Sequence, residues 1–125
     1  LKTGDKYYIC DLGLRKYLLG VLRDYGSILE NVIFLELKRR NNEIYIGKYD
    51  DMEVDFVVKN ETGIRYIQVS LSVRDEKTLA HELRPLQSIS DNYPKYIITL
   101  DYDYVDYDGI KQINAIDFLL GRTDI

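Results

Sequence analysis

The chain has very little cysteine, histidine and proline, and these shortages exclude several classes of protein. Its 125 residues include one cysteine, one histidine, two prolines and no tryptophan. Cys10 has no partner for an internal disulfide, so the chain is not a disulfide-stabilised scaffold, and the composition fits the reducing cytoplasm, where we expect the protein. With one cysteine and one histidine, His81, a zinc site is not expected.

Long hydrophobic runs and an excess of positive charge are also lacking. No apolar stretch approaches the roughly 20 residues that a membrane-spanning helix needs, so we expect no membrane partner. The net charge is −4 and the pI is about 5.0. A domain that binds duplex DNA through a broad electrostatic surface is normally basic. The charge therefore argues against strong non-specific binding to nucleic acid, although a local basic patch stays compatible with it.

What is present is the composition of a folded domain. The chain is 46% hydrophobic and 30% charged, and its length fits a single domain over residues 1–125. Twelve tyrosines supply rings with polar tips, which suit strands and interfaces. Because the chain begins with Leu1 and enters a strand-like segment almost at once, we expect it to be a fragment of a longer protein.

A helix is predicted in the first third of the chain. Ser27 and Glu30 have the spacing of a capping box, which predicts a helix from there to about Arg40, closed by Asn41-Asn42. A turn is expected at Tyr25-Gly26. Before that turn, the pattern predicts a strand at residues 7–10 and a segment at 12–19 that Asp11 caps and Gly20 ends.

Three strands joined by short polar turns follow, which predicts an antiparallel meander at residues 43–48, 52–59 and 64–73. In the second strand we expect two alternating faces, one formed by Met52, Val54, Phe56 and Val58 and the other by Glu53, Asp55 and Val57.

The rest of the chain alternates helix and strand. The pattern predicts a helix that Asp75 caps and Pro85 kinks or splits, a strand at 95–100, an acidic loop at 101–109 that packs its tyrosines against the domain, a strand at 110–113 and a helix at 114–120. The order helix, three strands, helix, strand predicts an α/β fold with a mixed sheet flanked by helices.

Acidic and polar residues on these elements have the spacing of a metal-dependent nuclease site. Glu30 shares a helical stripe with apolar residues, where an acid is costly unless it is paired or bound. Asp55 lies on the second strand, and Gln68 and Ser70 lie on one face of the third. Carboxylates suit hard cations, so Asp55 and Glu30 are candidate ligands for Mg²⁺ or Mn²⁺. Gln68 would add a neutral oxygen, but Ser70 has no positive charge to stabilise an attacking water.

Simpler interpretations stand beside this one. Glu30 can serve only in the capping box, and Asp55 can be a solvent-facing strand residue. Glu36 is a second candidate for the helix acid. The basic run 38–40 fits a solvated helix end, and His81 fits an exposed helical face.

Several blocks of the sequence, in order, resemble one known family. They are Glu30-Asn-Val-Ile-Phe-Leu-Glu-Leu, Ile46-Gly-Lys, Glu53-Val-Asp-Phe-Val-Val, Ile67-Gln-Val-Ser, Asp75-Glu-Lys-Thr, Asn92-Tyr-Pro-Lys-Tyr and Gly109-Ile-Lys-Gln-Ile-Asn. From about Asp5 to Gly121 the chain resembles the C-terminal domain of unknown function in bacterial and archaeal AAA+-like ATPases. That domain is similar to the PD-(D/E)XK, or restriction-endonuclease-like, nucleases.

The resemblance implies a restriction-endonuclease-like fold and an ATP-binding AAA+-like domain, joined in cis on the N-terminal side. This chain itself has no glycine-rich phosphate loop. By resemblance Glu30 is the helix acid and Asp55 the strand acid, while Gln68 stands at the usual Glu position and Ser70 at the usual Lys position. The site is therefore degenerate.

The expected function is a non-catalytic accessory module of an AAA+-like ATPase that recognises nucleic acid or a protein partner. One alternative is a divergent divalent-metal-dependent nuclease that uses Glu30, Asp55 and Gln68. Another is a protein-interaction or oligomerisation domain, with a homo-oligomer as its product.

Overall fold

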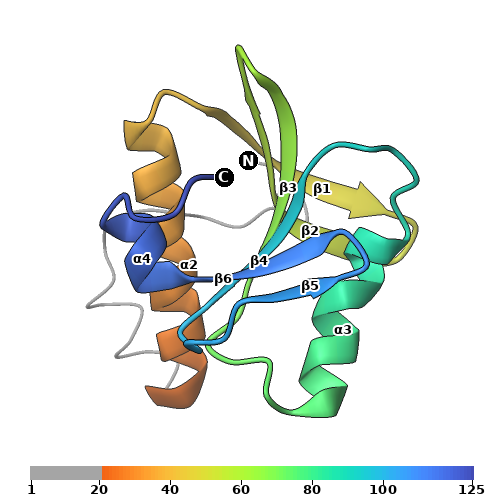
Figure 1. Ribbon diagram of the computed structural model, residues 1–125. Helices are drawn as coiled ribbons and strands as arrows, with labels where there is room; N and C mark the ends of the chain where they lie inside the picture. The colour runs from red at the N-terminus through yellow and green to blue at the C-terminus, as the bar shows by residue number, and fades with distance from the viewer. Residues whose placement is uncertain (1–20) are drawn as a thin grey trace.

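The computed structural model describes residues 21–125 and contains a six-stranded mixed sheet flanked by helices (Figure 1). The sheet order is β1-β2-β3-β4-β6-β5. The strands are β1 (Glu43–Tyr49), β2 (Met52–Asn60), β3 (Gly63–Val69), β4 (Lys95–Thr99), β5 (Val105–Tyr107) and β6 (Ile110–Asn114), and the helices are α2 (Val21–Arg39), α3 (Glu76–Gln87) and α4 (Ala115–Leu119). The predicted α/β class is confirmed, whereas the strand at 7–10 and the segment at 12–19 lie outside the described residues.

The first three strands form the antiparallel meander that the turns predicted. β1 pairs with β2 and β2 with β3 in antiparallel fashion, whereas β4 joins both β3 and β6 in parallel. The order α2, three strands, α3, β4 is compatible with a restriction-endonuclease-like α/β fold. β5 and β6 add an antiparallel hairpin at the far side of β4.

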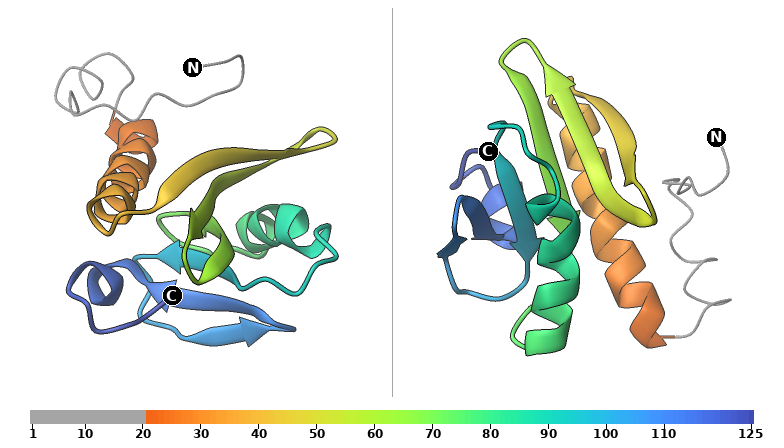
Figure 2. Two further views of the ribbon diagram at one scale, coloured as in Figure 1. Left: turned by 90° about the horizontal axis from the view of Figure 1, so that it is seen from above. Right: turned by 90° about the vertical axis from the view of Figure 1, so that its right-hand side faces the viewer.

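The sheet separates two hydrophobic cores. Figure 2 shows α2 and α4 on one face of the sheet and α3 on the other. Neighbouring strand residues point to opposite faces, so Ile98 packs in the core under α2 and α4, while Ile97 packs under α3. The first core includes Leu29, Ile33, Leu37, Phe56, Ile67 and Phe118, and the second includes Val54, Leu83, Leu86 and Ile110.

Helix α2 continues through the position where a turn was expected. It includes Tyr25 and Gly26, so the predicted turn and the capping box at Ser27 are both wrong. A glycine inside a helix costs about 1 kcal/mol relative to alanine. The buried stripe of Leu29, Ile33 and Leu37 offsets that cost, because each buried side chain of this kind contributes about 2 kcal/mol. Within residues 21–125, neither α2 nor any other helix is long and apolar enough to cross a bilayer.

The end of α2 was predicted correctly. Asn41 adopts a left-handed conformation with φ of 65°, which closes a helix as glycine often does. The backbone N–H of Asn42 donates to the carbonyl of Leu37 at 3.4 Å, and the Asn42 side chain donates to the same oxygen at 2.9 Å. The two asparagines therefore satisfy the last carbonyls and start β1.

Strand β2 contains a β-bulge that the expected alternation missed. Tyr45 of β1 pairs with Val57, and Gly47 pairs with Val54, so one β1 residue faces both Asp55 and Phe56. Beyond the bulge the faces are exchanged. Val54 packs under α3, whereas Phe56 packs in the core under α2. The prediction that both side chains share a face is wrong for this reason.

Strand β3 ends at Val69, four residues earlier than predicted. The N–H of Ser70 still donates to the carbonyl of Ile98 at 3.1 Å. The N–H of Val73, however, donates to the buried carboxylate of Asp101 at 2.9 Å. Backbone bonds to the β4 side continue to Leu71, whose carbonyl accepts from the N–H of Leu100 at 3.0 Å, and by Val73 a side chain has replaced the neighbouring strand.

The C-terminal elements lie within a residue or two of the predicted bounds, with two differences. Asp75 caps α3 by accepting from the N–H of Thr78 at 3.0 Å. The helix is not split at Pro85, because this residue lies in the last turn and removes only one backbone donor. The predicted loop 101–109 also contains β5, a strand of three residues that the sequence analysis missed.

Candidate functional site

The backbone pairing between strands β2 and β3 stops beside two of the candidate site residues. Their backbone pairing ends at Phe56 and Ile67. At the next position side chains connect the strands instead. Oε1 of Gln68 accepts from the N–H of Asp55 at 2.7 Å, and Oδ2 of Asp55 accepts from the N–H of Val69 at 2.9 Å. We call Asp55, Gln68 and Val69 the β2–β3 junction.

Both the oxygen and the nitrogen of the Gln68 side-chain amide form hydrogen bonds within the protein. Its oxygen holds Asp55, and its Nε2 donates to the backbone carbonyl of Glu82 in α3 at 3.2 Å. The side chain is only 4% exposed, so each of these bonds satisfies a group that water reaches poorly. An ionised glutamate at this position could accept from Asp55 but could not donate to Glu82, because a carboxylate has no proton. An amide therefore matches this position better than the expected carboxylate does.

A cavity of about 490 Å³ lies next to the junction, between α3 and the start of β2. The sequence analysis identified Asp55 and Gln68 but not the contribution of α3, and it placed His81 only on an exposed face. His81 is exposed, as expected, yet it also lines this cavity. The only available signal was helical spacing, since His81 and Arg84 are three residues apart on α3. The lining residues are Asp51, Met52, Glu53, Asp55, Gln68, His81, Glu82, Arg84 and Pro85.

The other two candidates lie elsewhere. Glu30 is partly buried on α2, the helix that covers the opposite face of the sheet from α3 (Figure 2), and it does not line the cavity. Ser70 also stays outside the lining, and its hydroxyl donates to the carbonyl of Ser72 at 3.0 Å. The structure thus brings together Asp55 and Gln68, but it does not add Glu30 or Ser70 to them.

Glu36, the second candidate for the helix acid, belongs to an ion-pair cluster instead. Its carboxylate accepts from Arg39 and from Arg40, each with a shortest distance of 2.6 Å. Hydrogen bonds from Arg39, and then from Arg40, lower the pKa of Glu36 to about 2. Arg40 also stacks on the Phe118 ring, 4.3 Å from its centroid, and donates to the Phe118 carbonyl at 2.7 Å. The end of α2 is therefore fastened to α4 rather than merely solvated.

The residues at the junction do not fit a divalent cation well. One oxygen of Asp55 is held by a backbone N–H, both ends of the Gln68 amide are taken by the protein, and Glu30 is outside the cavity. Mg²⁺ and Mn²⁺ need several oxygen ligands that are free to converge on one point. Among residues 21–125, no group of three or more His, Cys, Asp and Glu side chains is arranged to hold a metal ion.

Two relatives share the whole domain with this chain. An uncharacterized protein of Haemophilus influenzae is 39% identical over 122 residues, which cover 96% of this chain and 30% of that protein. An uncharacterized protein of Methanocaldococcus jannaschii is 38% identical over 121 residues, which cover 90% of this chain and 26% of that protein. The chain thus spans less than a third of either relative. No protein-family model and no solved structure matches it.

Proposed function

We propose that this domain is a non-catalytic recognition module with a nuclease-like fold, and that it serves a longer protein that also carries an AAA+-like ATPase domain. The observation that carries the proposal is the use of the Gln68 amide. It bonds Asp55 with its oxygen and Glu82 with its nitrogen. A residue that connects two strands and a helix in this way has a structural role.

Two further features support this proposal. Ser70, at the position where a nuclease would need a lysine, bonds its own loop and supplies no positive charge to a transition state. The two relatives are more than three times as long as the shared region, which leaves room for a further domain. The ATPase itself rests on the family resemblance of the sequence blocks.

The rival function is a divergent metal-dependent nuclease, and one observation favours it. The cavity beside the junction is lined by four acidic residues, Asp51, Glu53, Asp55 and Glu82, together with His81 and Arg84. Hydrolytic enzymes use acidic and basic side chains in one cavity to transfer protons and activate water. This function would need Asp55 and Gln68 to release their present partners when metal binds.

The deciding experiment changes Gln68 to Glu and follows stability with and without metal. The new carboxylate faces the carbonyl of Glu82 without a proton to donate, so we expect Gln68→Glu to lower the unfolding temperature at neutral pH. Protonation of the new carboxyl at acidic pH should restore part of the lost unfolding temperature. If the junction is only structural, millimolar Mg²⁺ or Mn²⁺ will not restore stability at neutral pH, and calorimetry will detect no metal binding to the native chain.

Gln87→Glu, at an exposed position in helix α3, is the matched control and should leave stability nearly unchanged. Cleavage assays on single-stranded DNA, duplex DNA and RNA with each metal complete the test, using the native chain and the double variant Gln68→Glu/Ser70→Lys. Metal-dependent cleavage by the native chain that Asp55→Ala abolishes would overturn the proposal. Metal rescue of Gln68→Glu would do so as well, because it would reveal a coordination site.

A further inference from the structure

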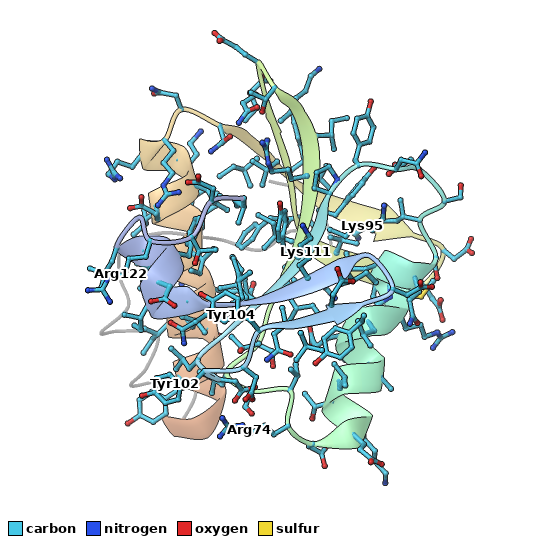
Figure 3. The ribbon with its side chains drawn as sticks, in the orientation of Figure 1. Arg74, Lys95, Tyr102, Tyr104, Lys111 and Arg122 are labelled. Carbon is cyan, nitrogen blue, oxygen red and sulfur yellow. The ribbon has the colours of Figure 1, made fainter. Side chains whose placement is uncertain are left out.

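Three tyrosines among residues 21–125 leave more than half of their surface exposed, and they lie in two places. Tyr102 and Tyr104 belong to the β4–β5 loop, so the prediction that this loop packs its tyrosines against the domain is wrong for both. In Figure 3 they lie between Arg74 and Arg122, each of which pairs with an aspartate. Charges of both signs therefore adjoin these two rings. The third tyrosine, Tyr45, lies on an edge strand instead.

Strand β1 forms one edge of the sheet. It pairs with β2 on one side, and no strand within residues 21–125 pairs with its other side. Natural edge strands are often protected by proline, by short length or by a bulge of their own. β1 has seven residues and no proline, and the extra residue of the adjacent bulge lies in β2. None of these three devices protects β1, so its outer N–H and C=O groups can pair with a further strand.

Tyr45 and Gly47 place an exposed ring beside a cavity on this edge. They are two residues apart on one strand and therefore share a face of the sheet. Tyr45 is 53% exposed, whereas Gly47 lines a cavity of about 330 Å³ that Val54, Val57 and Tyr66 also line. A Cβ on Gly47 would lie 2.8 Å from Cγ2 of Val57. No side chain at position 47 could therefore fill the cavity without displacing Val57.

The segments before and after β1 carry opposite charges. The basic run 38–40 lies at the end of α2, and Asp50 and Asp51 form the turn after β1. Both aspartates are exposed. The two arginines of the run share one acid, Glu36, which leaves a net positive charge. In an antiparallel pair, the residues before one strand lie beside the residues after the other. Two copies of β1 would therefore bring opposite charges together at both ends.

We propose that β1 pairs in antiparallel fashion with β1 of a second copy of this chain, so that one sheet extends across a dimer. A two-fold axis between identical antiparallel strands pairs one residue with its own copy. We assign this position to Ile46, the middle residue of Glu43–Tyr49, because all seven residues then have a partner. Tyr45 then lies across from Gly47 of the second copy, and its ring covers the cavity beside that glycine. An aromatic ring across from a glycine stabilises a strand pair in this way.

Neighbouring registers match less well. In the proposed register, Glu43 faces the uncharged Tyr49 of the second copy. An axis at Tyr45 would place Glu43 across from the glycine, and an axis at Gly47 would place Glu43 across from Asp51, where like charges repel. A strand of unrelated sequence could pair with the β1 backbone, but a second copy matches the backbone, the cavity and both charged flanks at once. This inference concerns assembly and goes beyond the recognition role proposed above.

Sedimentation equilibrium of the native chain tests the proposal. We expect a monomer–dimer equilibrium that shifts toward monomer as salt is added, because salt screens the charged flanks. Tyr45→Ala should raise the dissociation constant of the dimer about tenfold. Asp51→Lys should also weaken the dimer, and adding Lys38→Glu to it should restore part of the affinity. The matched control is Tyr102→Ala, which removes an exposed ring from the β4–β5 loop and should leave the dissociation constant unchanged.

Cysteine cross-linking tests the register. In a Cys10→Ser background, Ile46→Cys places two thiols directly opposite each other. Paired residues of antiparallel strands have Cα atoms about 4.5–5.5 Å apart, which a disulfide can span, so mild oxidation should link the two copies. Ile44→Cys, two residues along the same face, is the control. Its own copy would lie about 13 Å away along the strands, so it should form no such link.

Three results would overturn the inference. The first is a native chain that stays monomeric at every concentration, and the second is a dimer that Tyr45→Ala and Tyr102→Ala affect equally. The third is cross-linking of Ile44→Cys as readily as of Ile46→Cys.

Hydrogen exchange of the β1 amides identifies what covers the edge. A dimer should protect these amides more strongly as the protein concentration rises. Protection that does not change with concentration would mean that another segment of the same chain covers the edge, which would also overturn the inference. None of these measurements depends on the metal and cleavage experiments, so failure of the two proposals is distinguishable.

Discussion

The β2–β3 junction and the loop between β4 and β5, residues 100–104, use their side chains in opposite ways. At the junction, Asp55 and Gln68 direct their polar groups inward, to Val69, to each other and to Glu82. In the loop, Tyr102 is 84% exposed. Two residues with the spacing of an active site thus hold the fold together, whereas the loop keeps a large aromatic side chain in solvent.

This difference has an energetic consequence. A side chain whose hydrogen bonds are all made inside the protein must break them before it can bind anything else, and each broken bond to a buried group costs about 1–3 kcal/mol. An exposed ring loses only water and some rotational freedom on binding. We therefore expect mutations at the junction to lower stability, and mutation of the exposed Tyr102 to leave stability nearly unchanged.

The largest expected effect is at Gln68. Gln68→Ala removes the acceptor of the Asp55 N–H and the donor to Glu82, and it leaves a small cavity in a buried place. Together these losses should lower the free energy of unfolding by about 2–4 kcal/mol. Urea unfolding measures this change, and the exposed Gln87→Ala in α3 should stay within about 0.5 kcal/mol. If Gln68→Ala lowered the free energy of unfolding by no more than Gln87→Ala does, Gln68 would not be a structural residue and its contrast with Tyr102 would fail.

Most of the fold followed from patterns in the sequence that act over short range. Asp75 caps helix α3 as predicted, the helix predicted at 114–120 is present as α4 with Asn114 as its cap, and polar turns delimit the three antiparallel strands. The errors came where tertiary contacts override local signals. Gly26 should have ended or delayed α2, yet the helix passes through it because a long apolar stripe lies beneath.

The candidate site could likewise be predicted from the sequence only in part. The pairing of Asp55 with Gln68 was predictable, because both belong to adjacent strands in a hairpin with a short turn. The bulge at Asp55 and Phe56 was not, since the sequence alternates without interruption and only the pairing with β1 exposes the extra residue. Nor could sequence alone show that the carbonyl of Glu82 occupies the Gln68 amide, because that contact depends on how α3 packs on the sheet.

An intermediate effect is expected at Glu36, whose polar group is also directed to partners within the protein. Its pKa falls from 4.5 to about 2 in the folded state. The carboxylate therefore contributes stability that is fully present above pH 4.5 and is lost as the pH falls toward 2. Glu36→Gln should lower the free energy of unfolding by about 1 kcal/mol at neutral pH.

Urea unfolding of both proteins across this pH range measures the difference, which should shrink as the pH falls below 4.5 and disappear below pH 2. Glu61→Gln, at an exposed position in the β2–β3 turn, is the control and should show no such convergence. A difference between the native chain and Glu36→Gln that persists unchanged down to pH 2 would mean that the arginine contacts do not depend on the charge of Glu36.

The smallest expected effect on stability is at Tyr102, and it is the most direct test of the contrast between this exposed ring and the buried Gln68. This ring has 84% of its surface exposed, so its truncation removes almost no buried contact. Tyr102→Ala should change the free energy of unfolding by less than about 0.5 kcal/mol. Tyr104→Phe should cost slightly more, because it removes the hydrogen bonds with Asp117 and Thr123. If urea unfolding instead gave Tyr102→Ala a loss comparable with that of Gln68→Ala, Tyr102 would contribute to the fold despite its exposure.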